Sequence, residues 1–156
     1  MSKFAALFCA GSFLLVGGRL ASRAQTAADA RDGVAFFEKN IRPVLVESCY
    51  KCHSAKDVFS SYKGNLRVDN MQSLRKGGSS GNPAVLPGDV EKSELIQSIR
   101  YLYTGEDAKK NMPSKSDKVS KKLPDAVIKD FERWVKMGAP VPEDFKEPAK
   151  GTAVEK

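Results

Sequence analysis

Two cysteines and a histidine stand close together in the run Cys49-Tyr50-Lys51-Cys52-His53. Two thiols at this spacing can each form a thioether with one vinyl group of a porphyrin, and the next residue can then bring its imidazole beneath the iron. His53 is the only histidine in the chain, so no other imidazole competes for this role. The motif therefore predicts one covalently attached haem c, with Cys49 and Cys52 as attachment points and His53 as the proximal iron ligand.

Three other uses of the same residues can be weighed. A structural zinc site needs four cysteine or histidine ligands, and beyond the motif the only further candidate is Cys9, inside an apolar N-terminal run. A thioredoxin-like dithiol is favoured by the apolar residues 44–46, but residues 54–65 are too polar for the helix that must follow. A local disulfide between the two cysteines is the third alternative. The dithiol and the disulfide stay open.

The N-terminus has the pattern of a signal peptide. Lys3 gives it a positive start, and residues 4–18 form an uncharged apolar run that is short for a membrane span. Small residues at Ser22-Arg23-Ala24 predict cleavage after Ala24; cleavage after Ala28 and retention as an anchor are the alternatives. Haem is attached to cysteines outside the bacterial inner membrane, so leader and motif both indicate the periplasm. We expect a signal peptide at 1–24, one domain at 25–142 and a flexible tail at 143–156.

Composition limits the class of partner. The chain has 156 residues, 41% of them hydrophobic, and a formal charge of +7. Loss of residues 1–24 removes three positive charges and no negative one, which leaves +4. This charge is too small, and aromatic residues too rarely interleave with it, for a nucleic-acid-binding protein. We expect a monomer with no membrane span after signal cleavage.

Apolar residues recur at helical spacing in three stretches. The first is predicted to be capped by Asp32 and kinked or restarted at Pro43, and its apolar face carries Phe36, Phe37, Ile41, Val44 and Leu45. The second follows a turn at residues 87–89, with Glu91 and Glu94 in its first turn, and its buried face is predicted to hold Leu95, Ile96, Ile99, Leu102 and Tyr103. The third starts near Pro124, ends at Gly138, and carries a stripe of Val127, Ile128, Phe131, Trp134 and Val135.

The intervening segments are predicted to be irregular or only briefly helical. Residues 54–65, 77–83 and 104–123 lack helical periodicity, and a short helix is expected from near Asp69. The pattern predicts a mostly α-helical fold, with long loops, around one covalently bound haem.

A second axial ligand is expected from a methionine, because a thioether raises the potential of haem iron and closes it to outside ligands. Met112 stands in the loop before the last helix and is followed by Pro113, which stiffens the backbone. Met71 lies close to the motif, and Met137, in the last helix, is expected to pack. Met112 is therefore the predicted distal ligand, with a surface methionine or an open iron as the alternative.

Lysines gather around Met112. Asp117 is the only acidic residue between Lys109 and Lys122, a stretch that holds Lys109, Lys110, Lys115, Lys118, Lys121 and Lys122. Such a run is either solvated surface or a docking rim that steers acidic redox partners toward the haem edge.

Residues 36–142 resemble the planctomycete-type cytochrome c domain. The resemblance rests on residues 37–45 leading into the motif, and on Leu66-Arg67-Val68-Asp69, Lys76-Gly77-Gly78, Pro87-Gly88-Asp89, Met112-Pro113 and residues 123–125 and 134–140. It implies a helical cytochrome c fold with Cys49 and Cys52 bonded to haem, His53 proximal and Met112 distal. The expected function is single-electron transfer between redox proteins, without catalysis of substrate chemistry. A haem enzyme or gas-binding module with an open sixth site, and a haem-free thiol-redox protein, are the alternatives.

Overall fold

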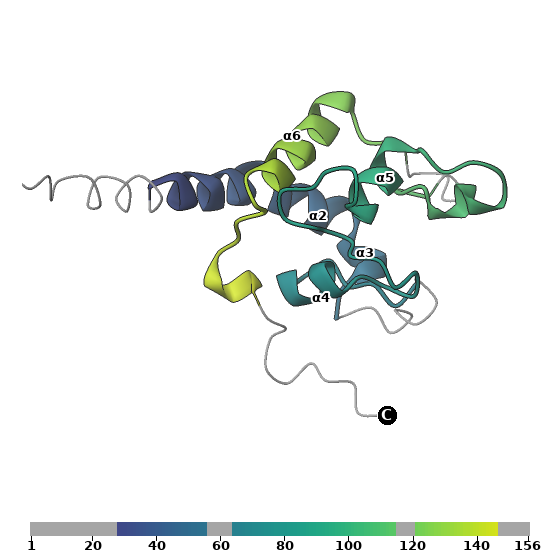
Figure 1. Ribbon diagram of the computed structural model, residues 1–156, viewed down its shortest axis with the longest axis horizontal. Helices are drawn as coiled ribbons and strands as arrows, with labels where there is room; N and C mark the ends of the chain where they lie inside the picture. Colours follow the sequence, from purple (N-terminus) through teal and green to yellow (C-terminus); the bar gives the residue numbers. More distant parts are fainter. Residues whose placement is uncertain (1–27, 56–63, 115–120, 147–156) are drawn as a thin grey trace, which may run out of the picture.

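The computed structural model describes residues 28–55, 64–114 and 121–146 (Figure 1). The expected signal peptide at 1–24 lies outside these residues, as does the end of the expected tail, 147–156. Over the described ranges the protein is mostly helical and has no strand, only an isolated bridge between Leu86 and Asp89. The predicted mostly α fold class is therefore confirmed. None of the described helices is both long and apolar enough to cross a membrane.

The chain leads into the motif through one interrupted helix. Residues 28–36 are helical, the π-helical turn η1 (Phe37–Ile41) follows, and α2 (Arg42–Ser48) continues from it. Pro43 lies in the first turn of α2, as expected; it has no N–H to donate to the carbonyl four residues earlier, which explains the wider turn before it. The prediction that Asp32 caps this helix is wrong, because the helix is already formed at residue 28.

Of the remaining helices, α6 is the longest, and the others are short. In chain order they are α3 (Tyr50–His53), α4 (Met71–Lys76), α5 (Glu94–Arg100), the 3-10 helix η3 (Gly105–Lys110), α6 (Asp125–Lys136) and the 3-10 helix η4 (Glu143–Phe145). The predicted loop at 104–123 thus contains a helical segment. Asn70 caps α4 by accepting the Ser73 N–H at 2.8 Å, so this helix begins two residues later than predicted.

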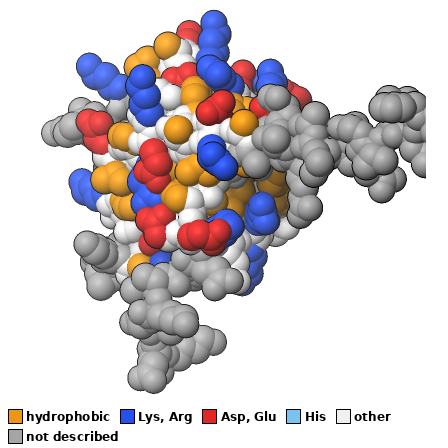
Figure 2. Space-filling model, turned by 90° about the vertical axis from the view of Figure 1, so that its left-hand side faces the viewer, with side chains coloured by type: hydrophobic (Ala, Val, Ile, Leu, Met, Phe, Trp, Pro, Cys, Tyr) orange, Lys and Arg blue, Asp and Glu red, His pale blue; other side chains and the backbone are white. Residues whose placement is uncertain are grey.

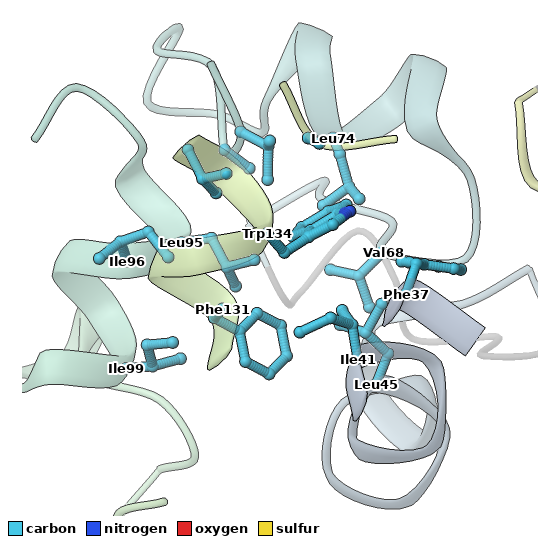
Figure 3. Close-up of a cluster of buried hydrophobic side chains, with 14 of the residues drawn as sticks. Phe37, Ile41, Leu45, Val68, Leu74, Leu95, Ile96, Ile99, Phe131 and Trp134 are labelled. Atoms are coloured by element: carbon cyan, nitrogen blue, oxygen red, sulfur yellow. The ribbon is translucent and has the colours of Figure 1, made fainter. Parts of the chain in front are cut away.

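Helix α6 is the centre of the core. Its predicted stripe is confirmed: Ile128, Phe131, Trp134 and Val135 are buried, and Val127 is partly buried. Figure 3 shows Trp134 and Phe131 between side chains of α5 and those of the N-terminal helix. Trp134 lies 5.5 Å from the ring of Phe37 and satisfies its indole N–H on the carbonyl of Pro140 at 2.9 Å. One helix thereby holds the two flanking helices in fixed positions.

The packed region extends past the boundary expected at residue 142. Phe145 is 1% exposed and its ring lies 4.7 Å from that of Phe37. Arg42 lies over both rings and makes two hydrogen bonds to Asp144, at 3.0 and 3.1 Å. Aromatic burial and this ion pair therefore fix η4 onto the N-terminal helix.

Helix α5 is shorter than its apolar pattern suggests. Tyr101 takes the left-handed conformation (φ 63°, ψ 43°) and ends the helix at Arg100. Leu95, Ile96 and Ile99 are buried as predicted, but Leu102 lies beyond the helix and is 53% exposed. Three predictions are therefore wrong, because Leu102 and Tyr103 lie beyond the helix instead of on its buried face, and Glu91 lies before the first turn of α5.

Two glycines in the loop after α4 have positive φ for different reasons. Gly77 (φ 76°) is buried, and a Cβ there would lie 1.7 Å from the carbonyl oxygen of Asn82. Gly81 (φ 78°) is exposed, and a Cβ there would meet nothing within 4 Å. Gly77 is thus required both by conformation and by close packing of the loop, whereas Gly81 is required by conformation alone.

We predict that Gly77→Ala destabilises the protein far more than Gly81→Ala. A positive φ costs an alanine about 1–3 kcal/mol at either position, and the clash at Gly77 should bring its total to about 3 kcal/mol or more. Unfolding in denaturant, followed by circular dichroism, measures both. Equal losses would show that the close approach to Asn82 does not constrain the fold.

Candidate functional site

The cysteines and the histidine of the motif come together in one helical turn. Cys49 ends α2 by donating its N–H to the carbonyl of Leu45 at 2.9 Å. The carbonyl of Cys49 then accepts the N–H groups of Cys52 (3.1 Å) and His53 (2.9 Å), which closes the turn that continues as α3. Leu45 is fully buried, so the core anchors the helix that leads into the motif, as the sequence predicts.

His53 is held twice by one short segment. Its Nδ1 lies 3.0 Å from the carbonyl oxygen of Leu66, and its own carbonyl accepts the N–H of Val68 at 2.8 Å. A carbonyl can only accept, so this hydrogen bond places the ring proton on Nδ1 and makes Nε2 the metal-binding nitrogen. The segment at 66–68 therefore fixes both the tautomer and the orientation of the imidazole.

The carboxylate of Asp69 also links the motif to the segment at 66–68 by hydrogen bonds. Its Oδ2 accepts the N–H of Ala55 at 2.7 Å and Nη2 of Arg67 at 2.9 Å. Its Oδ1 accepts Nε of Arg67 and Nδ2 of Asn70, both at 3.0 Å. Burial alone would raise the pKa of this carboxyl, but the hydrogen bonds from Arg67 and Ala55 hold the pKa below its ordinary value.

Close backbone packing supports the segment from the other side. The N–H of Ser79 donates to the carbonyl of Gly64 at 2.7 Å. A Cβ on Gly78 would lie 2.2 Å from that same oxygen and 3.1 Å from Cβ of Leu66. Gly78 is therefore required because the chain passes directly behind Leu66, whose carbonyl accepts the hydrogen bond from His53.

The thiol of Cys49 is not activated. Burial, together with the neighbouring Cys52, raises the pKa of Cys49 to about 12. Both cysteines are free thiols and both side chains are partly exposed. Reactive cysteines of dithiol enzymes have lowered pKa values, so this environment is opposite to the one they require.

Met112 belongs to a different part of the fold, the C-terminal end of α5. Its N–H donates to the carbonyl of Ser98 at 3.0 Å. The neighbouring Asn111 is buried and pairs with Tyr103 in both directions, accepting its N–H at 3.1 Å and donating to its carbonyl at 2.9 Å. Tyr101 donates its hydroxyl to the carbonyl of Pro113, which follows a cis peptide bond. Met112 itself is thus bonded to α5, and the residues on both sides of it are bonded to Tyr103 and Tyr101, just after that helix.

The other methionines have different environments. Met71 is 3% exposed in α4 and belongs to the core, whereas Met137, expected to pack, is 38% exposed at the end of α6. Met112 is partly exposed.

Several residues that build the site were not identified from the sequence. The roles of Asp69, which lies in a recognised run, and of Asn111, beside Met112, were missed, because each bonds a backbone group several residues away: Ala55 for Asp69 and Tyr103 for Asn111. A buried polar residue beside a site residue is the signal that could have found them.

The lysines near Met112 are partly neutralised. Lys110 pairs with Asp107 at 3.0 Å and lies over the ring of Tyr103, and Lys122 pairs with Asp125 at 3.4 Å. Lys109 and Lys121 are exposed, while Lys115 and Lys118 lie outside the described residues. Figure 2 shows that acidic and basic side chains are also interspersed on another face of the molecule.

An apolar groove of about 960 Å³ lies elsewhere, between the N-terminal helix, α4 and residues 138–146. Met71, Ala139 and Val141 contribute apolar surface, and Arg31 and Arg75 contribute positive charge. None of the motif residues lines it, so the groove is separate from the candidate site.

The donor set fits a covalently attached haem. Two thiols and an imidazole share one turn, and the imidazole has its Nδ1 proton directed at a backbone carbonyl. A hydrogen bond from the ring nitrogen that does not bind the metal is typical of metal-ligating histidines. The same turn can therefore offer two sulfur atoms for attachment and Nε2 for iron.

Comparison with known proteins agrees with this chemistry. The family model described as Planctomycete cytochrome C matches residues 49–115. No curated protein and no solved structure matches the chain. The match starts at Cys49 and includes the segment that holds His53 and the loop that carries Met112, although it is shorter than the resemblance seen over 36–142. The predicted resemblance to planctomycete cytochrome c is therefore confirmed over residues 49–115.

Proposed function

We propose that the protein is an exported, periplasmic monohaem cytochrome c that carries single electrons between redox proteins as a monomer. The observation that supports this best is the orientation of His53, whose Nδ1 lies 3.0 Å from the Leu66 carbonyl. The haem would supply an iron that alternates between the ferrous and ferric states. The protein would attach it, orient it and exclude water from it.

The two cysteines and the histidine of the motif have separate roles in this proposal. Cys49 and Cys52 would hold the haem through thioethers to its two vinyl groups; addition of S–H across a vinyl group needs no oxidant. His53, with its Nδ1 proton donated to the Leu66 carbonyl, would offer Nε2 to the iron. With one histidine in the chain, a single haem of this kind is proposed.

Met112 is proposed as the distal ligand. The hydrogen bonds of Met112 to Ser98 of α5, and of Asn111 and Pro113 to Tyr103 and Tyr101, support this, because a fixed loop limits the entropy lost on ligation. The exposed side chain of Leu102 lies in the same region of sequence, just after α5. An apolar haem face that covered Leu102 would remove that exposure.

We predict that Met112→Ala abolishes the weak red absorption band of methionine-ligated ferric haem. The reduction potential should also fall, because a thioether ligand stabilises the ferrous state. Met137→Ala, at an exposed methionine of α6, is the control and should leave the band unchanged. Visible spectroscopy and potentiometric titration measure both effects.

Two results would contradict this assignment. Retention of the band in Met112→Ala would assign ligation to another residue. A wild-type protein that lacks the band and binds carbon monoxide or azide readily would instead be a haem enzyme or a gas-binding module.

A haem-free thiol-redox function would require Cys49 to have a lowered pKa. Such an enzyme needs a thiolate near neutral pH, whereas burial raises the pKa of Cys49 to about 12. The environment of this thiol therefore supports a site for covalent attachment over a dithiol enzyme.

In haem-free protein with Cys52→Ser, we predict slow alkylation of Cys49 by iodoacetamide at pH 8. A raised pKa lowers the thiolate fraction at this pH, so the folded protein should react about tenfold or more slowly than the protein in denaturant. The rate should still be rising with pH above the ordinary range for a thiol. Equal rates for folded and unfolded protein at pH 8 would favour the thiol-redox alternative.

The lysines around Met112 are proposed as a docking rim for acidic redox partners. Lys109 and Lys121 are exposed near the two ends of the loop that leads from η3 toward α6. Positive charge beside a redox site accelerates encounter with an acidic partner, and salt screens this effect.

We predict that Lys109→Glu combined with Lys121→Glu slows electron exchange with a small acidic redox protein. The rate should also depend less steeply on ionic strength. Stopped-flow mixing over a series of salt concentrations measures both quantities, and Lys129→Glu, at an exposed position of α6, is the control. A wild-type rate that does not change with salt would exclude the docking rim.

A further inference from the structure

The carboxylate of Asp69 lies where the motif and the segment 66–69 meet. It accepts four hydrogen bonds: one from Ala55, two residues after His53; two from Arg67, one residue after Leu66; and one from Asn70. The side chain is 15% exposed, so these bonds are partly shielded from water. Four hydrogen bonds equal the number of lone-pair sites that a carboxylate commonly offers, about four.

These bonds matter because residues 66–68 belong to no helix or strand. Among the described residues, the Leu66 carbonyl is positioned by the packing of Gly78 and Val68 and by three polar contacts: Val68 N–H to His53, Arg67 N–H to Ser73, and the Asp69 carboxylate. Asp69 joins the backbone after His53, at Ala55, to the side chain of Arg67, which follows Leu66. A shift of this carboxylate would move the acceptor of the His53 ring proton.

We propose that Asp69 is a positioning residue that sets the hydrogen bond between His53 and Leu66, and through it the reduction potential. The inference rests on the proposed function, since it concerns the same haem. A hydrogen bond from Nδ1 increases electron donation from Nε2 to a bound metal. Stronger donation stabilises ferric iron, so an intact Asp69 keeps the potential low.

The test is Asp69→Asn in the haem-loaded full chain. Asparagine has the same size but presents N–H donors where one oxygen accepted, so it faces Ala55 or Arg67 with donor against donor. The exchange of the His53 Nδ1 proton with water should become roughly tenfold faster, and the reduction potential should rise. With one histidine in the chain, labelling histidine with nitrogen-15 gives one ring to follow by NMR.

The matched control is Asp144→Asn. Asp144 also makes two hydrogen bonds to an arginine, Arg42, but it fastens η4 to the N-terminal helix instead of contacting the segment at 66–69. Its loss should lower stability without a change in proton exchange or potential. Arg67→Gln leaves Asp69 in place and should shift both quantities in the same direction by less, which keeps the test available if Asp69→Asn does not fold.

The possible outcomes separate this inference from the proposed function. Unchanged proton exchange and potential in Asp69→Asn, or equal changes in Asp69→Asn and Asp144→Asn, would overturn the role of Asp69. If the chain carries no haem, the proposed function fails. The nitrogen-15 spectrum of the haem-free chain still decides the positioning role, because the intact protein should hold the Nδ1–H tautomer and Asp69→Asn should hold a mixture.

Discussion

The hydrogen bond from the His53 ring to the Leu66 carbonyl is the constraint around which this domain is built. An α3 of four residues cannot by itself define where an imidazole points. The direction comes from a segment further along the chain, which pairs with His53 at both the ring and the backbone carbonyl. Gly78, packed behind Leu66, and the saturated carboxylate of Asp69 each keep that segment in place.

The hydrophobic core positions the motif relative to the Met112 loop. The motif follows the N-terminal helix and α2, while the Met112 loop is fastened to α5, so the two proposed haem ligands belong to separate elements. Helix α6 packs against both, with Trp134 on Phe37, and with Phe131 in the same buried cluster as Ile99 of α5 (Figure 3). Burial of these side chains therefore fixes the relative position of the two halves of the site, which haem ligation from both faces requires.

The sequence predicts those features that depend on neighbouring residues: a chemical motif and the apolar periodicity of a helix. The motif is recognisable because thioether attachment needs two cysteines at fixed spacing, and α6 because five apolar residues recur on one face. Leu102 was misplaced because one left-handed residue, Tyr101, ended α5 before the apolar pattern did. The burial of Phe145, the role of Asp69 and the anchoring by Asn111 depend on partners distant in sequence, and such contacts leave no periodic signal.

The central claim is that the helical turn at Cys49–His53 holds a covalently bound haem. Mass spectrometry of the protein exported by a bacterium competent in haem attachment tests it most directly. We predict an intact mass greater by one haem, with the added mass on the peptide that contains both Cys49 and Cys52. Neither thiol should react with an alkylating reagent. An intact mass without haem, with both thiols alkylated after reduction, would contradict it.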